Sequence, residues 1–472
     1  MILFLFLFTI IECNLSTTLF LTENKGAVWN TNQKYKNYDV IWSRPKGLIY
    51  GNLVGSDIAQ KANLYPDMFS TYFVANIRMQ PEWTLMIKGE YPHSRYFSFT
   101  VAKELGNGQV GGGTYLRSDQ ILPDTGSLNP FSPSNNRSVT NRNYTIYFIY
   151  GNILNKTAVN TLYTGLSDKS QRSHLSLRIY LQDLGYDGSG ICKIGETCIN
   201  SLPIVTLIFK NGTSVTGPEL LTLLNATKNG DPNGYDLNQW LEEVNNKTDK
   251  VNAPCTGKSY AQVFWNTPYS VTGSFEALDF EKRVKDYPPN TDGGFASNPD
   301  TKYMLIFISF GFNEILVVKG KKPTHPNTLY GDIFLPENPQ VQYFSFSTGG
   351  APPSGEGWDT VFDQQIPVDS NGDYTVVVSW RWNRPNNAII ENGVVWIDPG
   401  EGEGHYIGAR GWISLLYIRF QGNNPNWRRS PSNIPMPSTS NPIPMDAEVM
   451  GPYYPRSVYM SKNYFEKTYF QN

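Results

Sequence analysis

Residues 96–100 read YFSFT and residues 343–348 read YFSFST, so a chain of 472 residues contains nearly the same aromatic stretch twice. A longer match precedes each copy. TYFVANIRMQPEWTLMIKGEYP (71–92) aligns without a gap with KYMLIFISFGFNEILVVKGKKP (302–323), and the two share a Tyr, a Lys-Gly pair and a closing Pro. Two matches in the same order indicate a tandem duplication of one unit.

Two further matches follow the aromatic stretch in both halves. DQILPD (119–124) corresponds to DQQIPVD (363–369), and YTIYFIYGN (144–152) corresponds to YTVVVSWRW (374–382). The matched blocks are rich in β-branched and aromatic residues and are bounded by Gly, Pro, Asn or Asp, which is typical of strands and turns. Asn371-Gly372 adds a hairpin signal, because both central positions of that turn need positive φ. The sequence therefore predicts a mainly β fold of two tandem β-sandwich or jelly-roll-like domains, with a small helical insert between them.

The insert is predicted from a change of period. In YDLNQWLEEVNNK (235–247) the apolar residues recur at helical spacing, and GPELLTLLNATKNG (217–230) predicts a second, shorter helix. We expect five segments along the chain: a signal peptide over 1–16, a first β-sandwich repeat over 17–165, a strand hairpin plus two-helix insert packing on the first domain over 166–285, a second β-sandwich repeat over 286–427, and a Pro-rich C-terminal strap over 428–472.

The overall charge excludes one class of partner. The chain has 39 Lys and Arg against 41 Asp and Glu, with a pI near 6.2, so it has no charge excess to attract nucleic acid, and we expect no nucleic-acid partner. Met1–Ile11 is apolar but too short to cross the roughly 30 Å hydrocarbon core of a bilayer. This stretch predicts a cleaved secretory signal, although it lacks a basic residue before the apolar run. An uncleaved anchor or a buried strand is the alternative.

No other stretch approaches transmembrane length, so we expect no membrane span in the mature chain and a secreted or extracellular protein. In a secreted protein, cysteines can form disulfides. Cys192 and Cys198 bound the loop CKIGETC, which a hairpin can close with a disulfide in an oxidising compartment; reduced thiols are the alternative, and Cys255 is left over. A zinc site needs four ligands, and neither a second CxxC nor a paired His accompanies these residues, so no metal is expected.

Secretion also gives meaning to the Asn-x-Ser/Thr triplets, all of which lie before residue 250. None has Pro at its middle position, so each can accept an N-linked glycan, and together they predict a glycoprotein. The predicted acceptors are Asn136, Asn143, Asn155, Asn211, Asn225 and Asn246.

The sequence contains fragments of cofactor-binding and metal-binding motifs, but the residues around each fragment do not complete the motif. GNGQVG (106–111) matches a phosphate-binding pattern, but strand-like residues follow it where a helix is needed. DSNGD (369–373) begins like a calcium loop and then has Tyr374 and Trp380 where that loop needs Gly and Glu. The chain has no G-x-S-x-G elbow, and no pair of carboxylates stands out as a glycosidase needs. We therefore predict no cofactor and assign no catalytic residue.

Tryptophans are concentrated in the second repeat. Aromatic faces on a β-sandwich can bind sugar rings through apolar contact, although alternate members can instead fill the core between the sheets. The candidate ligand-binding residues are Trp358, Trp380, Trp382, Trp396 and Trp412.

Several blocks are similar to those of an uncharacterised family of exported tandem β-domain proteins from bacteria and large DNA viruses. The blocks include RYFSFTV (95–101), YLRSDQILPDTGSLNPF (115–131), RIYLQDLGYDGSG (178–190), LPIVTL (202–207) and MGPYYPRSVYMSKNYFE (450–466). The resemblance implies an exported, repeated β-protein and brings no established activity.

The residues and the resemblance together predict a secreted glycoprotein with a binding or assembly role at a cell or virion surface. Its expected partner is carbohydrate or another surface protein. Two other classes stay open: an exported hydrolase that acts on glycans, and a purely structural surface component.

Overall fold

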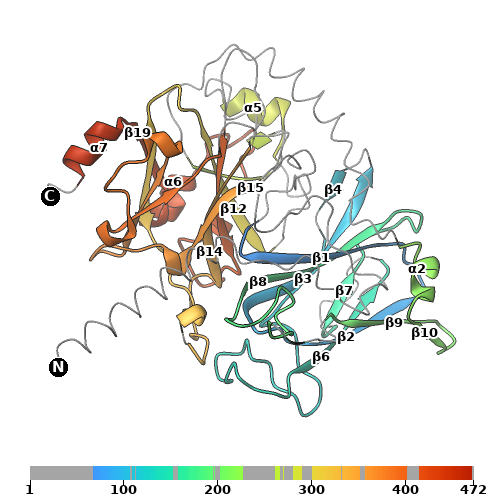
Figure 1. The fold of residues 1–472 in the computed structure, drawn as a ribbon. Helices are drawn as coiled ribbons and strands as arrows, with labels where there is room; N and C mark the ends of the chain where they lie inside the picture. Colours follow the sequence, from blue (N-terminus) through green and yellow to red (C-terminus); the bar gives the residue numbers. More distant parts are fainter. Residues whose placement is uncertain are drawn as a thin grey trace, which may run out of the picture.

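In the computed structural model, the fold consists of two β-sandwiches that lie side by side (Figure 1). The predicted mainly β fold is confirmed, and the helices of the described residues are few and short. The structure describes residues 67–106, 109–111, 113–151, 158–194, 196, 202–226, 261–265, 269–270, 280–289, 300–330, 332–350, 357–400 and 414–469. The predicted signal peptide and the predicted helix at 235–247 lie outside these residues, as do Asn155, Cys198, Asn246, Cys255 and Trp412.

The first sandwich has two five-stranded sheets. One has the order β1-β8-β3-β4, with β5 also paired to β3, and the other has the order β10-β9-β2-β6-β7. Their apolar faces enclose a core that includes Phe97 and Leu177 from one sheet and Ile87 and Phe148 from the other. The strands are β1 (Ser70–Ile77), β2 (Thr84–Glu90), β3 (Ser94–Gly106), β4 (Gln109–Gly111), β5 (Tyr115–Arg117), β6 (Asn143–Ile149), β7 (Thr161–Tyr163), β8 (Ser173–Gln182), β9 (Ile204–Ile208) and β10 (Ser214–Thr216).

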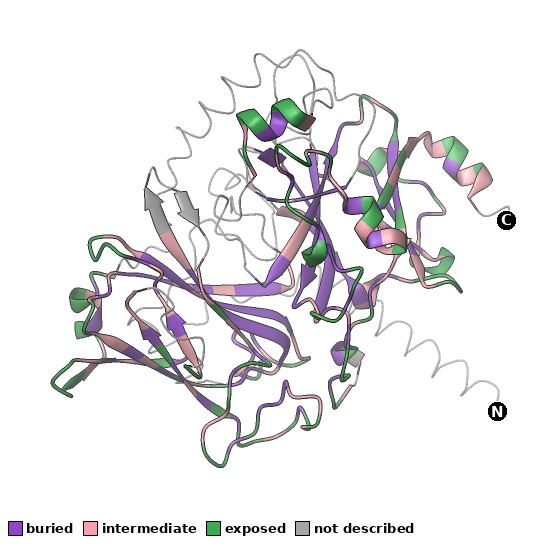
Figure 2. Ribbon diagram, turned by 180° about the vertical axis from the view of Figure 1, so that it is seen from behind, coloured by how far each residue is buried: buried purple, intermediate pink, exposed green. Residues whose placement is uncertain are grey.

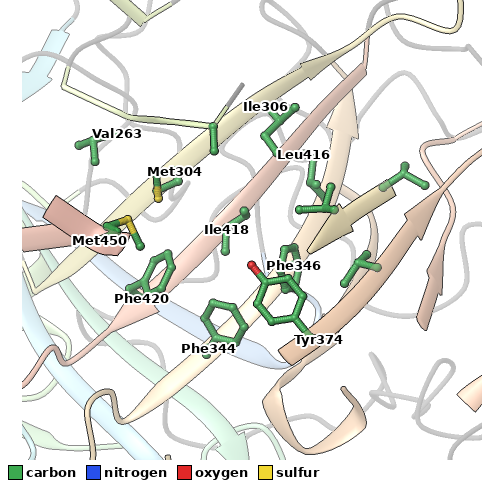
Figure 3. Packing of buried hydrophobic residues seen from close by; sticks show 14 of the residues in the cluster. Val263, Met304, Ile306, Phe344, Phe346, Tyr374, Leu416, Ile418, Phe420 and Met450 are labelled. Atoms are coloured by element: carbon green, nitrogen blue, oxygen red, sulfur yellow. The ribbon is translucent and has the colours of Figure 1, made fainter. Parts of the chain in front are cut away.

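The second sandwich has a sheet of order β11-β12-β18-β14-β15 and a sheet of order β17-β16-β13-β19. Phe344, Phe346, Tyr374 and Ile418 pack between these sheets (Figure 3). The strands are β11 (Gln262–Val263), β12 (Thr301–Ile308), β13 (Ile315–Lys321), β14 (Tyr343–Gly350), β15 (Gly357–Phe362), β16 (Asp373–Val378), β17 (Val394–Ile397), β18 (Ser414–Gln421) and β19 (Arg456–Met460).

Short helices connect and cover the strands. The α-helices among the described residues are α2 (Glu219–Leu223), α5 (Phe280–Asp286), α6 (Asp446–Met450) and α7 (Lys462–Thr468). The 3-10 helices are η2 (Thr328–Tyr330), η3 (Asp363–Gln365), η4 (Arg381–Asn383), η5 (Ile390–Asn392), η7 (Pro431–Asn433) and η8 (Gly451–Tyr453).

Both sandwiches repeat one strand order. In the first, β1-β8-β3 faces β9-β2-β6-β7; in the second, β12-β18-β14 faces β19-β13-β16-β17. Each sandwich also contains one parallel pair at the same place, β6 with β7 and β16 with β17. The register agrees as well, because Tyr72 lies opposite Arg178 and its sequence match Tyr303 lies opposite Arg419. The repeated sequence blocks therefore occupy equivalent strands.

The shared Lys-Gly pair has a packing explanation. Gly89 lies opposite Tyr144, and Gly320 lies opposite Tyr374. A Cβ added at Gly89 would lie 2.7 Å from the Tyr144 hydroxyl oxygen, and one at Gly320 would lie 2.8 Å from that of Tyr374. Because each phenol ring occupies the space that a side chain would need, only glycine fits opposite it.

Two of the predicted segments contribute strands to the sandwiches. β8 and β9 lie within residues 166–285, and they pair with β1, β3 and β2 of the first sandwich. β19 and α7 lie within residues 428–472, where β19 pairs with β13 and the α7 residue Phe465 is fully buried. Figure 2 shows the buried residues along the strands of both sandwiches and the mixed exposure of α7.

The two sandwiches meet through the strand faces that point away from their own cores. Tyr96, Tyr180 and Tyr343 form a buried aromatic cluster there with Phe362. The Tyr180 and Tyr343 ring centroids lie 5.4 Å apart, although the two residues come from different sandwiches. Part of the junction is therefore an apolar interface.

Buried ion pairs cross this junction. Arg95 of β3 pairs with Asp363 of η3, and both side chains are fully buried. Asp67, just before β1, pairs with Arg419 of β18 at 2.9 Å. The Asp67 carboxylate also accepts hydrogen bonds from the Tyr343 hydroxyl and the Ser345 hydroxyl. These bonds compensate for the removal of the charges from water.

Candidate functional site

A pocket of about 450 Å³ lies beside the junction of the two sandwiches. Met68 and Phe69, which precede β1 of the first sandwich, form one side of it. β15, η4 and β17 of the second sandwich and the residues next to them supply the aromatic and charged lining: Trp358, Asp359, Arg381, Arg384, Trp396 and Asp398. The volume is within the range of small-molecule binding sites, about 300 to 1,000 Å³.

Two of the predicted ligand-binding tryptophans meet in this pocket. Trp358 is on β15 and Trp396 is on β17, and both are half-buried. The backbone of Gly400 (φ +82°) lies against the Trp358 indole, because a Cβ added there would lie 2.6 Å from the ring. The Trp396 indole N–H donates to the Ser379 hydroxyl oxygen at 2.9 Å. Both indoles are thus held in place by the protein.

The other predicted tryptophans lie elsewhere. Trp380 and Trp382 stack on each other with ring centroids 5.3 Å apart and an interplanar angle of 9°. Trp382 is 65% exposed, whereas Trp380 also packs against Phe310. Neither lines the pocket, but they flank Arg381, which does. Trp412 lies outside the described residues.

The two aspartates of the pocket are engaged by other protein groups. Asp398 accepts from Arg381 Nε at 2.5 Å through Oδ2 and from the Gly400 backbone N–H at 3.0 Å through Oδ1. Asp359 accepts from the Thr360 backbone N–H at 2.9 Å through Oδ1 and from the Asp398 backbone N–H at 3.2 Å through Oδ2. Each carboxylate oxygen therefore already has a hydrogen-bond donor.

Arg384 is held differently. Its guanidinium carbon lies 4.6 Å from the centroid of the Trp396 ring, which is a cation–π contact. Its Nη2 donates to the Ala388 carbonyl oxygen at 3.1 Å. No carboxylate among the described residues pairs with Arg384. The pocket thus contains one guanidinium ion-paired with Asp398 and one stacked on an indole.

Sequence reasoning found the tryptophans of this site but not its charged residues. Arg381 and Arg384 lie in SWRWNRP (379–385), and the aspartates lie beside the two tryptophans, in WD (358–359) and WID (396–398). Their position in the sequence next to tryptophans of predicted strands is the signal that could have identified these charged residues.

A second pocket, of about 510 Å³, lies in the first sandwich. Its lining mixes polar residues such as Lys88, Glu90 and Asp124 with aliphatic ones such as Leu177 and Ile204, and Tyr144 is the one aromatic residue among the described residues that line it. Because Tyr144 is almost fully buried in the core, this pocket offers no aromatic surface to a ligand.

The predicted modification sites fall partly within the described residues. Four of the predicted acceptors are exposed: Asn136, Asn143, Asn211 and Asn225. Cys192 is buried, and its predicted disulfide partner Cys198 lies outside the described residues. The glycosylation sites and the disulfide stay predictions.

Within the described ranges, no group of three or more His, Cys, Asp or Glu side chains is placed to hold a metal ion. None of the helices in those ranges combines the length and apolar character that crossing a bilayer requires.

Comparisons with known proteins place the chain near uncharacterised bacterial structures. A crystal structure of an uncharacterized protein from Burkholderia cenocepacia matches with 11% identity and a TM-score of 0.45, covering 93% of this chain and 87% of that one. A protein from Vibrio parahaemolyticus matches with 10% identity and a TM-score of 0.34, covering 85% and 91%. The B domain of a biofilm associated protein matches with 10% identity and a TM-score of 0.18, covering 83% and 75%.

No protein-family model matches the chain, and no curated protein matches it. The structural likenesses are too distant to carry a functional argument. The function is therefore argued from the residues of the chain itself.

Proposed function

We propose that this protein is a secreted carbohydrate-binding protein that acts at a cell or virion surface, and that it binds a sugar in the pocket of Trp358 and Trp396. The observation that carries the proposal is the combination in one cavity of two fixed indoles with guanidinium and carboxylate groups. A sugar ring has apolar C–H faces, which pack on aromatic rings, and hydroxyl groups around its rim, which need polar partners.

The state of the carboxylates favours binding over hydrolysis. A glycosidase needs one protonated carboxyl and one carboxylate that are directed at the glycosidic bond. Here Asp359 and Asp398 use their oxygens to accept hydrogen bonds from Thr360, Gly400, Arg381 and the Asp398 backbone itself. This arrangement favours a structural role, in which both aspartates shape the pocket and Asp398 orients Arg381.

The exposed acceptor triplets support secretion and glycosylation. Asn136, Asn143, Asn211 and Asn225 are all exposed, as a glycan requires. Mass spectrometry of the chain secreted by a eukaryotic host tests this part of the proposal. Unmodified asparagines at all four positions would contradict it.

The binding site is tested on a glycan array with the full chain and three variants. Trp358→Ala and Trp396→Ala each remove an indole from the pocket, and we expect each to weaken binding by about tenfold or more. Tyr464→Ala is the matched control, because Tyr464 is an aromatic residue of α7 that is 58% exposed and does not line the pocket.

The control should bind as the unmodified chain does. If the unmodified chain retains no glycan, or if both tryptophan variants bind as well as the control, the proposed function is wrong. Release of a cleaved sugar that Asp359→Asn or Asp398→Asn abolishes would instead establish the hydrolase.

A further inference from the structure

Arg384 is an exposed residue of the pocket whose guanidinium is oriented by two contacts. Its guanidinium lies over the Trp396 ring, and its Nη2 donates to the Ala388 carbonyl oxygen. Trp396 is in turn anchored by the Ser379 hydroxyl, and Ala388 is fully buried. A guanidinium held in this way loses little side-chain freedom when it binds a ligand.

Arg384 forms no ion pair with the other charged residues of the pocket that the structure describes. Arg381 is ion-paired with Asp398, and the Asp359 oxygens accept backbone N–H groups. Arg384 has no ion pair among the described residues. Since one of its N–H groups serves Ala388, the others are available to a ligand within the described part of the site.

We propose that the ligand of this pocket is a sugar that bears a carboxylate, such as a uronic or sialic acid, and that Arg384 binds the carboxylate. This inference rests on the proposed function and names its ligand class. A guanidinium has a planar fork of donors that matches the two oxygens of a carboxylate, and such charge-assisted pairs are stronger than neutral hydrogen bonds. The sugar ring then lies among Trp358, Met68 and Phe69 on the other sides of the pocket.

The test is calorimetric titration of the full chain with matched pairs of small sugars. The methyl glycosides of glucuronic, galacturonic and N-acetylneuraminic acid are each compared with their own methyl ester, which keeps the ring and removes the charge. We expect at least one acid to bind about tenfold or more tightly than its ester. Raised salt should reduce this preference.

Two variants locate the effect. Arg384→Gln should bring the affinity for the acid down to the affinity for its ester. Arg384→Lys, which keeps the charge and loses the planar fork, should lose most of the preference. Arg428→Gln is the control, because Arg428 is an exposed arginine outside the pocket lining, and it should change neither affinity.

The outcomes separate this inference from the proposed function. If each acid and its ester bind equally well, the pocket does not recognise a carboxylate, and the inference is wrong. The proposed function then stands as a site for neutral sugars. A sulfated methyl glycoside is titrated in the same way. If it binds as tightly as the acid, the inference of carboxylate recognition is also wrong, because the pocket would then accept any anion. If no sugar binds in titrations or on the array, the proposed function fails and this inference fails with it.

Discussion

Asp300 is a carboxyl group that takes part in the junction between the two sandwiches. It is buried just before β12, and its carboxylate accepts a hydrogen bond from the Tyr96 hydroxyl of the other sandwich. Burial raises the pKa of Asp300 to about 7, while hydrogen bonds from Gln421 and Thr301 partly oppose the rise. Below about pH 7 the folded protein therefore holds Asp300 mainly in its protonated form.

This carboxyl should make the protein less stable as the pH rises. Between its ordinary pKa of 3.8 and its folded pKa of about 7, Asp300 binds more protons in the folded chain than in the unfolded chain. The free energy of unfolding then falls as the pH rises through this range, by roughly 1.4 kcal/mol for each unit of pKa difference at most. We expect Asp300→Asn, which is neutral throughout, to remove this part of the decrease.

The measurement is urea unfolding of both proteins at about pH 5 and about pH 8. The pH dependence of the variant must be compared with that of the unmodified protein, because His93 changes stability with pH in the opposite direction in both. Burial and the nearby Arg142 lower the pKa of His93 to about 3, so its contribution to stability is lost as the pH falls below 6.5. The same pH dependence in Asp300→Asn and in the unmodified protein would exclude this role for Asp300.

Among the elements, α7 shows how the C-terminal segment stabilises the second sandwich. Phe465 is fully buried against Ile315 and Val317 of β13 and Val377 of β16, on the sheet face that points away from the main core. Ser461 caps the helix, since its hydroxyl oxygen accepts from the Tyr464 backbone N–H at 3.1 Å. The helix thus covers an apolar face that would otherwise contact water.

Removing the Phe465 ring should be costly. We expect Phe465→Ala to lower the free energy of unfolding by about 3 to 5 kcal/mol, because it removes a buried aromatic ring and leaves a cavity. The adjacent Tyr464→Ala should change it by about 0.5 kcal/mol or less, since Tyr464 is exposed. Chemical denaturation of both variants measures the difference, and equal stabilities would mean that α7 does not cover this face in solution.

Most of the strands could be predicted from the sequence, because each matched block has its own alternation and bounding turns. The Lys-Gly pair shows what the sequence could not explain by itself. The sequence shows that the pair occurs in both halves. The reason for it lies in Tyr144 and Tyr374, each on the strand next to its glycine. For the same reason the tryptophans of the candidate site could be identified, whereas Arg384 depends on a loop that brings it onto Trp396.

At the scale of the whole molecule, the two sandwiches are joined by contacts between residues very far apart in the sequence. Arg419 and Asp67 are separated by 352 positions, and Arg95 and Asp363 by 268. No local pattern marks such pairs, so the junction could not be predicted. Because it combines buried ion pairs with an aromatic cluster, we expect the two sandwiches to unfold in one transition.

Removing Arg95 should weaken this coupling. Arg95→Ala leaves Asp363 buried without its charged partner, so we expect a loss of about 3 to 5 kcal/mol and a separation of the calorimetric transition into two. Lys210→Ala is the control, because the Lys210–Glu82 pair is exposed and its loss should leave the stability almost unchanged. An unchanged transition in Arg95→Ala would show that the sandwiches are not coupled through this pair.

The attachment of Asp67 to Arg419, Tyr343 and Ser345 has a mechanical consequence. Tension applied to the chain on the N-terminal side of Asp67 would be transferred first to β14 and β18 of the second sandwich, before it could peel β1 away from β8. A protein held through its N-terminal side would in this way load the second sandwich before the pocket residues Met68 and Phe69, which lie between Asp67 and β1, carry any force.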